Sequence, residues 1–365
     1  MTTERAPSLD AFRVAAVNCV MFSHSVLLGI DTFPSFRYIV FIFGWLGVEL
    51  FFVLSGFLIG RQLLDVALGT QSVKSFWWRR WFRTLPNYYL FLALNVALYA
   101  TILHRPGGDF SFLFFSYALI SPFNSPFFGE SWSLAIEEWF YLLAPLLVVV
   151  FASVIPNRQR KLTVIIAMIA IIIASVAARL WVAQHTEGSI DATMRKMVML
   201  RLDAIAFGVI LAWLERYHRS LLTSLSRLWW MAVPAVLLAS FYVGTLSQSL
   251  TILAPPSGVD RVLAPLLFTL LPLACALLLA GTAGLQVRER QWVSNQSKWS
   301  YSMYLLHFPL LLLILHFFGG FRDPNALFFG VVGWYVVTVF GAALIYRWYE
   351  KPCMNLRERF VPLGK

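Results

Sequence analysis

Charged residues are scarce in this chain, and their scarcity excludes most soluble folds. Asp, Glu, Lys and Arg make up 13% of the 365 residues, whereas 59% are hydrophobic and the mean hydropathy is +0.72. A water-soluble protein of this length could not bury so much apolar surface. Because lipid is the alternative solvent, the composition indicates an integral membrane protein.

Cysteine is also rare, and no compact basic segment is present. Cys19, Cys275 and Cys353 are far apart in the sequence, which indicates neither a disulfide framework nor a metal site. The formal net charge is +11, but the basic residues are scattered over short loops, a pattern that is not typical of nucleic-acid-binding domains. We therefore expect no metal, no tightly bound cofactor and no nucleic-acid partner.

Long apolar stretches fill most of the chain. A helix needs about 20 apolar residues to cross a bilayer, and it satisfies its own backbone hydrogen bonds there. About ten stretches have this length, which predicts an all-α integral membrane fold with about ten transmembrane helices. The predicted spans are 9–30, 37–60, 84–104, 132–155, 162–183, 197–215, 228–247, 262–284, 299–318 and 326–347. The apolar run 110–120 is too short and is interpreted as a re-entrant or interfacial piece.

The distribution of Lys and Arg predicts the orientation of the spans. With ten spans and an inside N-terminus, the inner segments hold twenty of the 29 Lys and Arg, and the outer loops hold six. Both termini are therefore expected in the cytoplasm. We expect one transmembrane domain over residues 1–350 and a short basic cytoplasmic tail over residues 351–365. The first stretch lacks a small-residue cleavage site, so it is expected to remain as a helix.

The first apolar stretch carries Arg13 and His24 on one helical face. Eleven steps of about 100° return to nearly the same face and rise about 16 Å along it. An ionisable side chain at membrane depth is costly, so a functional role for His24 is favoured over simple packing. Glu137, in the fourth stretch, is expected at the same depth, where it could pair with His24 and fix its tautomer. Tyr141 follows one turn later and shares the face of Glu137.

Two further carboxylates lie within apolar stretches. Glu49 is expected near mid-membrane, where a carboxylate needs a partner. Ser55 and Gly56 follow it, and such small residues commonly allow helices to pack closely. Glu138 points about 100° away from Glu137 and is expected to reach outward to the interface.

Polar residues also mark the sixth and ninth stretches. Arg201 and Asp203 are expected in the outer leaflet, where a local ion pair would account for both. Ser300, Tyr304 and His307 recur at i, i+4 and i+7, which predicts a polar stripe on one helical face.

Arg80 and Arg83 lie one helical turn apart, just before Pro86 and the third stretch. One interpretation is positive-inside anchoring within an aromatic belt. The other is a phosphate clamp, since the planar guanidinium presents a fork of donors to phosphate oxygens.

Seven segments of the chain together resemble acyltransferase family 3, in the order found in that family and over nearly the whole length. They are LDAFRVAAVNCVMFSH, GWLGVELFFVLSGFLIG, RRWFRTLPNYY, WSLAIEEWFYLLAP, RLDAIAFG, SYSMYLLHFP and RWYEKP. The family comprises bacterial integral-membrane O-acyltransferases that modify surface polysaccharides, lipid-linked sugars and some secreted small molecules. The resemblance implies a multi-pass protein of the inner (cytoplasmic) membrane.

The resemblance also implies roles for particular residues. Arg13 and His24 match the family's pattern of Arg, ten residues and His, with His24 as the catalytic base. Arg80 and Arg83 match the pair that would hold acyl-CoA phosphates, and Glu137 matches the carboxylate of the WSL-x-x-E segment. Further candidate pocket or oxyanion contacts are Glu49, Tyr141, Arg201, Asp203, Tyr304 and His307.

These observations fit one reaction. Acyl-CoA, expected to be acetyl-CoA, is the co-substrate and enters from the cytoplasm, with its phosphates on Arg80, Arg83 and Arg13. His24, oriented by Glu137, takes a proton from an acceptor hydroxyl that arrives from the outer side. The hydroxyl attacks the thioester directly or through a covalent intermediate, and the direct route is favoured because no Ser or Cys clearly pairs with His24.

The acceptor is open at this point. A sugar hydroxyl of a surface polysaccharide, oligosaccharide or lipid-linked saccharide is expected, and a small secreted metabolite such as a macrolide is the alternative. A transporter of saccharides or organic anions would also use buried His, Glu and Arg, although the paired inverted repeats typical of such proteins are not evident. The sequence does not indicate an oligomeric state.

Overall fold

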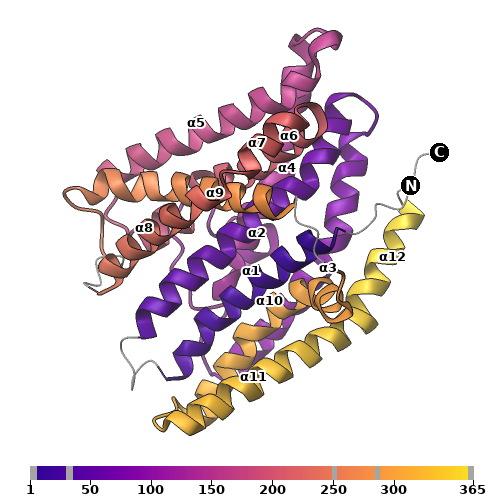
Figure 1. Ribbon diagram of the computed structural model, residues 1–365. Helices are drawn as coiled ribbons and strands as arrows, with labels where there is room; N and C mark the ends of the chain where they lie inside the picture. The colour runs from indigo at the N-terminus through magenta and orange to yellow at the C-terminus, as the bar shows by residue number, and fades with distance from the viewer. Residues whose placement is uncertain (1–5, 30–35, 249–252, 284–287, 361–365) are drawn as a thin grey trace.

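All regular secondary structure in the described part of the chain is helical. The computed structural model describes residues 6–29, 36–248, 253–283 and 288–360, and Figure 1 shows their arrangement. The helices are α1 (Pro7–Ser25), α2 (Phe36–Ala67), α3 (Val73–Thr101), α4 (Trp132–Val154), α5 (Lys161–His185), α6 (Leu202–Tyr217), α7 (Arg219–Ser226), α8 (Trp229–Gln248), α9 (Asp260–Ala283), α10 (Gln291–Phe318), α11 (Pro324–Ile345) and α12 (Lys351–Phe360). The all-α class is therefore confirmed.

Each of the ten predicted spans falls mainly within one long helix, but the number of membrane spans is not confirmed. By length and composition, seven helices of the described chain can cross a bilayer, or eight if the bent pair formed by α7 and α8 is one span. The helix α6 has 16 residues, fewer than the 20 or so that a crossing needs. The helix α3 is long enough, but Asn87, Asn95 and several tyrosines make it less apolar than the others.

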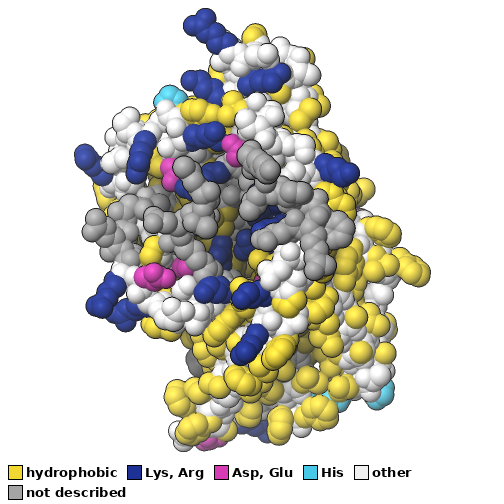
Figure 2. Space-filling view, turned by 90° about the vertical axis from the view of Figure 1, so that its right-hand side faces the viewer, with side chains coloured by type: hydrophobic (Ala, Val, Ile, Leu, Met, Phe, Trp, Pro, Cys, Tyr) yellow, Lys and Arg dark blue, Asp and Glu magenta, His cyan; other side chains and the backbone are white. Residues whose placement is uncertain are grey.

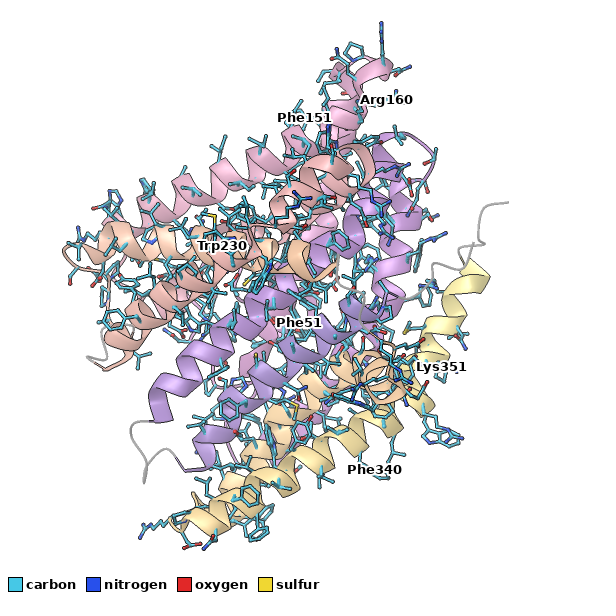
Figure 3. The ribbon with its side chains drawn as sticks, viewed as in Figure 1. Phe51, Phe151, Arg160, Trp230, Phe340 and Lys351 are labelled. Carbon is cyan, nitrogen blue, oxygen red and sulfur yellow. The ribbon has the colours of Figure 1, made fainter. Side chains whose placement is uncertain are left out.

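Large apolar side chains cover the outside of the helical bundle. Phe340 on α11 is 65% exposed and Trp230 on α8 is 58% exposed, and Figure 3 shows both on outer faces, whereas Phe51 lies in the interior. A soluble monomer rarely exposes so many large apolar groups. The surface is that of a multi-pass membrane protein.

Basic side chains gather at one end of the bundle (Figure 2). Arg160 and Lys351 lie at the same end, which also holds the start of α1 and the helix α12 (Figures 1 and 3). Figure 2 looks onto this end, and many Lys and Arg side chains gather there. Its assignment to the cytoplasm stays a prediction.

The helices α1 and α2 occupy the centre, with α5 to α9 on one side and α10 to α12 on the other (Figure 1). The backbones of α2 and α6 touch at two glycines. A Cβ at Gly56 would collide with the carbonyl oxygen of Ile205, and a Cβ at Gly208 would collide with that of Val53. Gly56 thus packs a neighbouring helix closely, as its sequence context predicted.

The connections between α3 and α4 and between α5 and α6 are largely free of long helices, and their backbones are joined to each other. The segment 110–120 contains only a short 3-10 helix, Phe110–Phe114, so it is not a further span. Its neighbours are joined to the segment between α5 and α6: Val198 N–H donates to Ala118 O at 2.8 Å, and Phe123 N–H donates to Ala192 O at 3.1 Å. Such backbone is tolerated at membrane depth when it is buried in protein.

Two buried ion pairs hold α2, α5, α6 and α9 together. Arg201 pairs with Glu49 of α2 and also donates to Phe268 O of α9 at 2.7 Å. Arg179 of α5 donates to both carboxylate oxygens of Asp203, at 2.9 and 2.6 Å. All four charged side chains are at most 3% exposed.

The predicted local pair between Arg201 and Asp203 is therefore wrong. Side chains two positions apart point to different sides of a helix, so neither can reach the other. Each finds its counter-ion on another helix instead.

The C-terminal segment is more ordered than a simple tail. A π-helical turn, Tyr346–Glu350, joins α11 to α12, which packs against α3. The Glu350 carboxylate accepts hydrogen bonds from Asn87 at 2.8 Å and Ser302 at 2.6 Å. Residues 351–360 of the predicted tail form α12, and residues 361–365 lie outside the described residues.

Removing one partner of the buried network should be strongly destabilising. Arg179→Met leaves Asp203 charged and unpaired, and we expect a loss of about 3–5 kcal/mol of unfolding free energy. The matched control is Arg61→Met, which breaks the exposed Arg61–Glu215 pair and should cost about 0–1 kcal/mol. Thermal unfolding in detergent micelles measures both, and equal shifts in Tm would contradict the prediction.

Candidate functional site

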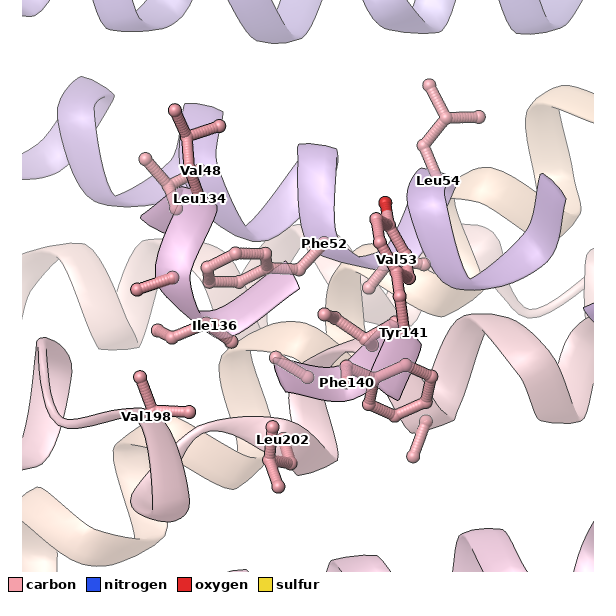
Figure 4. Packing of buried hydrophobic residues seen from close by; sticks show 14 of the residues in the cluster. Val48, Phe52, Val53, Leu54, Leu134, Ile136, Phe140, Tyr141, Val198 and Leu202 are labelled. Atoms are coloured by element: carbon pink, nitrogen blue, oxygen red, sulfur yellow. The ribbon is translucent and has the colours of Figure 1, made fainter. Parts of the chain in front are cut away.

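A cavity of about 90 Å³ lies between α1, α2, α3, α4 and α10. Apolar side chains form one wall, and Figure 4 shows Val48, Phe52 and Leu54 of α2 near Leu134 and Tyr141 of α4. The polar residues that line it are Arg13, Ser55, Arg80, Arg83, Thr84, Ser133, Glu137, Tyr141, Ser300, Tyr301 and Tyr304. Most of the predicted site residues are thus brought to one cavity.

Three arginines stand at the end of the cavity nearer the start of α1. Arg80 and Arg83 come from consecutive turns of α3, and Arg13 comes from the second turn of α1. Arg13 donates to Ser297 Oγ at 3.2 Å, and Ser297 Oγ donates to Asp10 at 2.6 Å. The arginines that the sequence singled out separately therefore share one binding space.

Glu137 belongs to the middle of the cavity and bonds along its own helix. Tyr141 Oη donates to Glu137 Oε2 at 2.9 Å. Because this bond uses the only hydroxyl proton of Tyr141, Ser55 Oγ is the donor in its 2.5 Å bond to Tyr141. The Arg80 guanidinium lies 6.0 Å from the centre of the Tyr141 ring, so it faces this polar group.

The expected pair between Glu137 and His24 does not form. Within the described residues, no hydrogen bond joins them, and each has other partners. His24 lies in the last turn of α1, and the 3-10 turn Val26–Leu28 continues this span. Residue 30, the end of the predicted span, lies outside the described residues. The pair fails because α1 packs against α10, which brings His24 to His307, whereas α4 packs against α2 and α5.

His24 instead contacts His307 of α10. The two ring nitrogens, His24 Nδ1 and His307 Nε2, are 2.9 Å apart. The other nitrogen of His307 lies 2.5 Å from the backbone oxygen of Tyr304, and Trp334 Nε1 donates to the backbone oxygen of His307 at 2.9 Å. His307 is fully buried, and both of its ring nitrogens are engaged, which leaves no donor for an oxyanion.

Tyr304 connects this histidine pair to the cavity. Its hydroxyl lines the cavity, donates to Glu130 O at 2.9 Å and lies 2.6 Å from Ser133 Oγ. The ring centres of Tyr304 and His307 are 5.6 Å apart. The three residues of the predicted polar stripe therefore lie along one face of α10: Ser300 and Tyr304 line the cavity, and His307 contacts His24.

A cationic group that the sequence did not single out lies near His24. Arg195 and Lys196 are close enough for their charges to act on His24, and both pair with Asp191 at 2.5 Å. The Arg195 guanidinium also lies 4.7 Å from the ring centre of Trp132. Asp191 and Arg195 belong to a π-helical turn, Asp191–Arg195, between α5 and α6, and this turn is too short to show a periodic pattern by which the sequence could have located them.

The remaining predicted contacts lie elsewhere. Glu49, Arg201 and Asp203 belong to the buried ion pairs and do not line the cavity. Glu138 is only 8% exposed and lies against Thr84 of α3, so its predicted outward orientation is wrong. No cluster of three His, Cys, Asp or Glu side chains in the described ranges could hold a metal ion.

Comparison with known families gives this arrangement a context. The family model described as "Acyltransferase domain" matches residues 7–347, nearly the whole chain. The chain belongs to this acyltransferase family. The resemblance drawn from the seven sequence segments is thus confirmed.

The chain is similar to peptidoglycan O-acetyltransferase OatA of Listeria monocytogenes and to O-acetyltransferase OatA of Staphylococcus aureus. The first is 32% identical over 179 residues, which cover 44% of this chain and 27% of that protein. The second is 24% identical over 373 residues, which cover 91% of this chain and 58% of that protein. The chain therefore spans less than two thirds of either relative. No solved structure matches it.

The dependence of stability on pH tests the ion pairs that Asp191 makes with Arg195 and Lys196. Burial alone would raise the pKa of Asp191, but Arg195 and Lys196 outweigh it and lower the pKa from 3.8 to about 2. A carboxylate with a lowered pKa stabilises the fold above about pH 4, and this contribution is lost as the pH falls towards 2. Asp191→Asn should therefore cost about 2 kcal/mol at pH 7.

Thermal unfolding of the wild type and the Asp191→Asn variant from pH 7 to pH 3 measures this contribution. The difference in stability should be constant down to about pH 4 and narrow below it. Asp65→Asn, at the exposed pair with Arg216, is the matched control and should change stability by at most about 1 kcal/mol. A difference that does not narrow below pH 4 would argue against the ion pairs of Asp191.

Proposed function

We propose that this protein is an O-acetyltransferase of the cytoplasmic membrane that moves an acetyl group from cytoplasmic acetyl-CoA to a sugar hydroxyl on the outer side. The observation that carries the proposal is the cavity with three arginines at one end and Tyr304, the neighbour of the His307–His24 pair, at the other. Membership of an acyltransferase family supports the reaction class.

The arginines suit the phosphates of the donor. Arg80 and Arg83 face one space from consecutive turns of α3, and guanidinium groups hold phosphate oxygens by paired, charge-assisted hydrogen bonds. Arg13 and His24 both lie on α1, and the eleven-residue step between them rises about 16 Å. The pantetheine arm would span this distance, so the nucleotide stays at the cytoplasmic end while the thioester reaches the histidines.

The chemistry proposed at the far end is direct acyl transfer. His24 takes the proton of the acceptor hydroxyl as that oxygen bonds to the thioester carbonyl carbon. The tetrahedral intermediate then collapses, the carbon–sulfur bond breaks, and the thiolate of coenzyme A leaves and takes the proton from the His24 imidazolium. A direct route needs no enzyme nucleophile, and no Ser or Cys hydrogen-bonds to His24 among the described residues.

The acceptor is proposed to be a hydroxyl of a cell-surface saccharide. One relative carries peptidoglycan in its name, and both are O-acetyltransferases by name. Asp191, Arg195 and Lys196 lie near His24 and would meet an acceptor that approaches from the outer side. A carbohydrate offers hydroxyl groups that such polar side chains can bind.

His24→Ala should abolish most of the transfer. Loss of a general base typically costs about 10²–10⁴-fold in rate. Purified protein is incubated with radiolabelled acetyl-CoA and a peptidoglycan-derived oligosaccharide, and labelled saccharide and free thiol are both measured. His316→Ala is the matched control, because His316 is an exposed histidine in the last turn of α10. A wild-type rate of transfer in His24→Ala would contradict the proposed role of His24 as the general base.

Arg80→Ala and Arg83→Ala should act mainly on donor binding. Each removes charge-assisted hydrogen bonds worth about 1.5–3 kcal/mol, so we expect KM for acetyl-CoA to rise about 10- to 100-fold with a smaller effect on kcat. Lys74→Ala is the control, since Lys74 is an exposed cation on the same helix outside the cavity. A fall in kcat at unchanged KM would contradict the phosphate clamp.

The same assay separates this proposal from membrane transport. A transporter would release no coenzyme A thiol with any acceptor, and saccharide uptake into proteoliposomes would depend on His24 or Glu137. Thiol release that requires both the acceptor and His24 supports the transferase.

A further inference from the structure

The ring of His307 makes two hydrogen bonds, and one of them fixes the position of its proton. His307 Nδ1 lies 2.5 Å from the backbone oxygen of Tyr304, one turn earlier on α10. A carbonyl oxygen can only accept, so Nδ1 must carry the hydrogen. The bond from Trp334 Nε1 goes to the backbone oxygen of His307 and does not involve either ring nitrogen.

The other nitrogen of His307 is then an acceptor in the neutral ring. A protonated His307 would place a positive charge on a side chain that is fully buried between Phe308, Met303 and Trp334. Within the described residues, no carboxylate bonds to either of its nitrogens. A buried charge without a counter-ion is costly, so the neutral form with a lone pair on Nε2 is favoured.

The proton position of His307 determines the tautomer of His24. Because His307 Nε2 is an acceptor, the 2.9 Å contact requires His24 Nδ1 to be the donor. His24 Nε2 is left with its lone pair, which is the form that a general base needs. The chain of bonds therefore runs from His24 Nδ1–H to His307 Nε2, and from His307 Nδ1–H to Tyr304 O.

We infer that His307 is a positioning residue that holds His24 in its Nδ1–H tautomer and so directs His24 Nε2 to the acceptor hydroxyl. The catalytic half of this inference rests on the proposed function. The sequence identified His307 as a candidate oxyanion contact, whereas the geometry gives it the place that a carboxylate occupies behind the histidine of many hydrolases.

A neutral imidazole behind the base has a distinct chemical effect. When His24 Nε2 takes the proton of the acceptor, the His24 ring becomes an imidazolium, and its Nδ1–H bond to His307 becomes charge-assisted and stronger. His307 keeps its own proton on Nδ1, so no second proton needs to move. The pair stabilises the transient cation and places no negative charge beside the bound thioester.

Replacement of His307 tests the inference through kinetics. His307→Leu removes the acceptor for His24 Nδ1–H, and we expect kcat to fall about 10- to 100-fold with KM for acetyl-CoA unchanged. His307→Gln supplies a side-chain carbonyl of similar reach, and it should recover most of kcat. Trp334→Phe is the matched control, because it removes a neighbouring bond but leaves both ring contacts of His307 intact, so it should retain nearly full kcat.

Folded yield and Tm in detergent micelles are measured for each variant. Equal losses in the Leu and Gln variants at wild-type Tm, full activity of His307→Leu, or a change confined to KM would overturn the inference.

The tautomer itself can be observed without any activity. Solid-state NMR of protein labelled with ¹⁵N and ¹³C in histidine distinguishes protonated from bare ring nitrogens, and the signals that vanish in His24→Ala and His307→Leu assign the two rings. Both should carry hydrogen on Nδ1, the minority position of free neutral histidine in water. An Nε2–H signal for His24 would overturn the inference even if the enzyme is active. Absence of acetyl transfer by the wild type, with the Nδ1–H signals present, would overturn only the proposed function.

Discussion

The pairs Glu49–Arg201 and Arg179–Asp203 lie where neither water nor lipid can satisfy a charge, so the protein itself must do so. Each charge finds its counter-ion on a different helix, and the guanidinium groups also reach backbone oxygens near the start of α6 and on α9. Breaking one contact would leave a buried charge behind, which makes the arrangement cooperative. The positions of α2, α5, α6 and α9 relative to one another are therefore fixed by these pairs. The helix α2 also forms one side of the cavity.

The opposite side of the cavity is built differently. Here α3 and α10 are joined by hydrogen bonds of neutral or singly charged groups: Tyr301 Oη donates to Thr84 O at 3.0 Å, and Asn87 and Ser302 both donate to Glu350. The arginines of α3 and the histidine of α10 thus lie on the side held by hydrogen bonds and not by buried ion pairs. The helix α1 contributes Arg13 and His24 from the centre.

Much of this could be predicted from composition and spacing, because lipid imposes simple rules on helices. The apolar stretches gave the all-α class, and the eleven-residue step in α1 placed Arg13 and His24 on one face. The partner of His24 was harder to predict, since depth along a helix does not say which helices are neighbours. The packing of α1 against α10 brings His24 to His307 and not to Glu137 of α4.

Partner choice could not be predicted from a single sequence. Arg201 and Asp203 are neighbours in the chain but belong to two different pairs, because their side chains point to different helices. Arg195 and Lys196 lie at the end of a π-helical turn that is too short to show a periodic pattern in the sequence. The contact between His24 and His307 joins residues 283 positions apart, and only the packing of α1 against α10 creates it.

The glycine contact between α2 and α6 limits how the protein can move. At Gly56 and Gly208 the two backbones touch, so any sliding of one helix would drive a side chain into the other's carbonyl groups. Together with the ion pairs, this contact makes α2 and α6 a single strut. The α2 wall of the cavity is thus joined to a helix that does not line the cavity itself, and a substitution at Gly208 would displace that wall without touching the cavity.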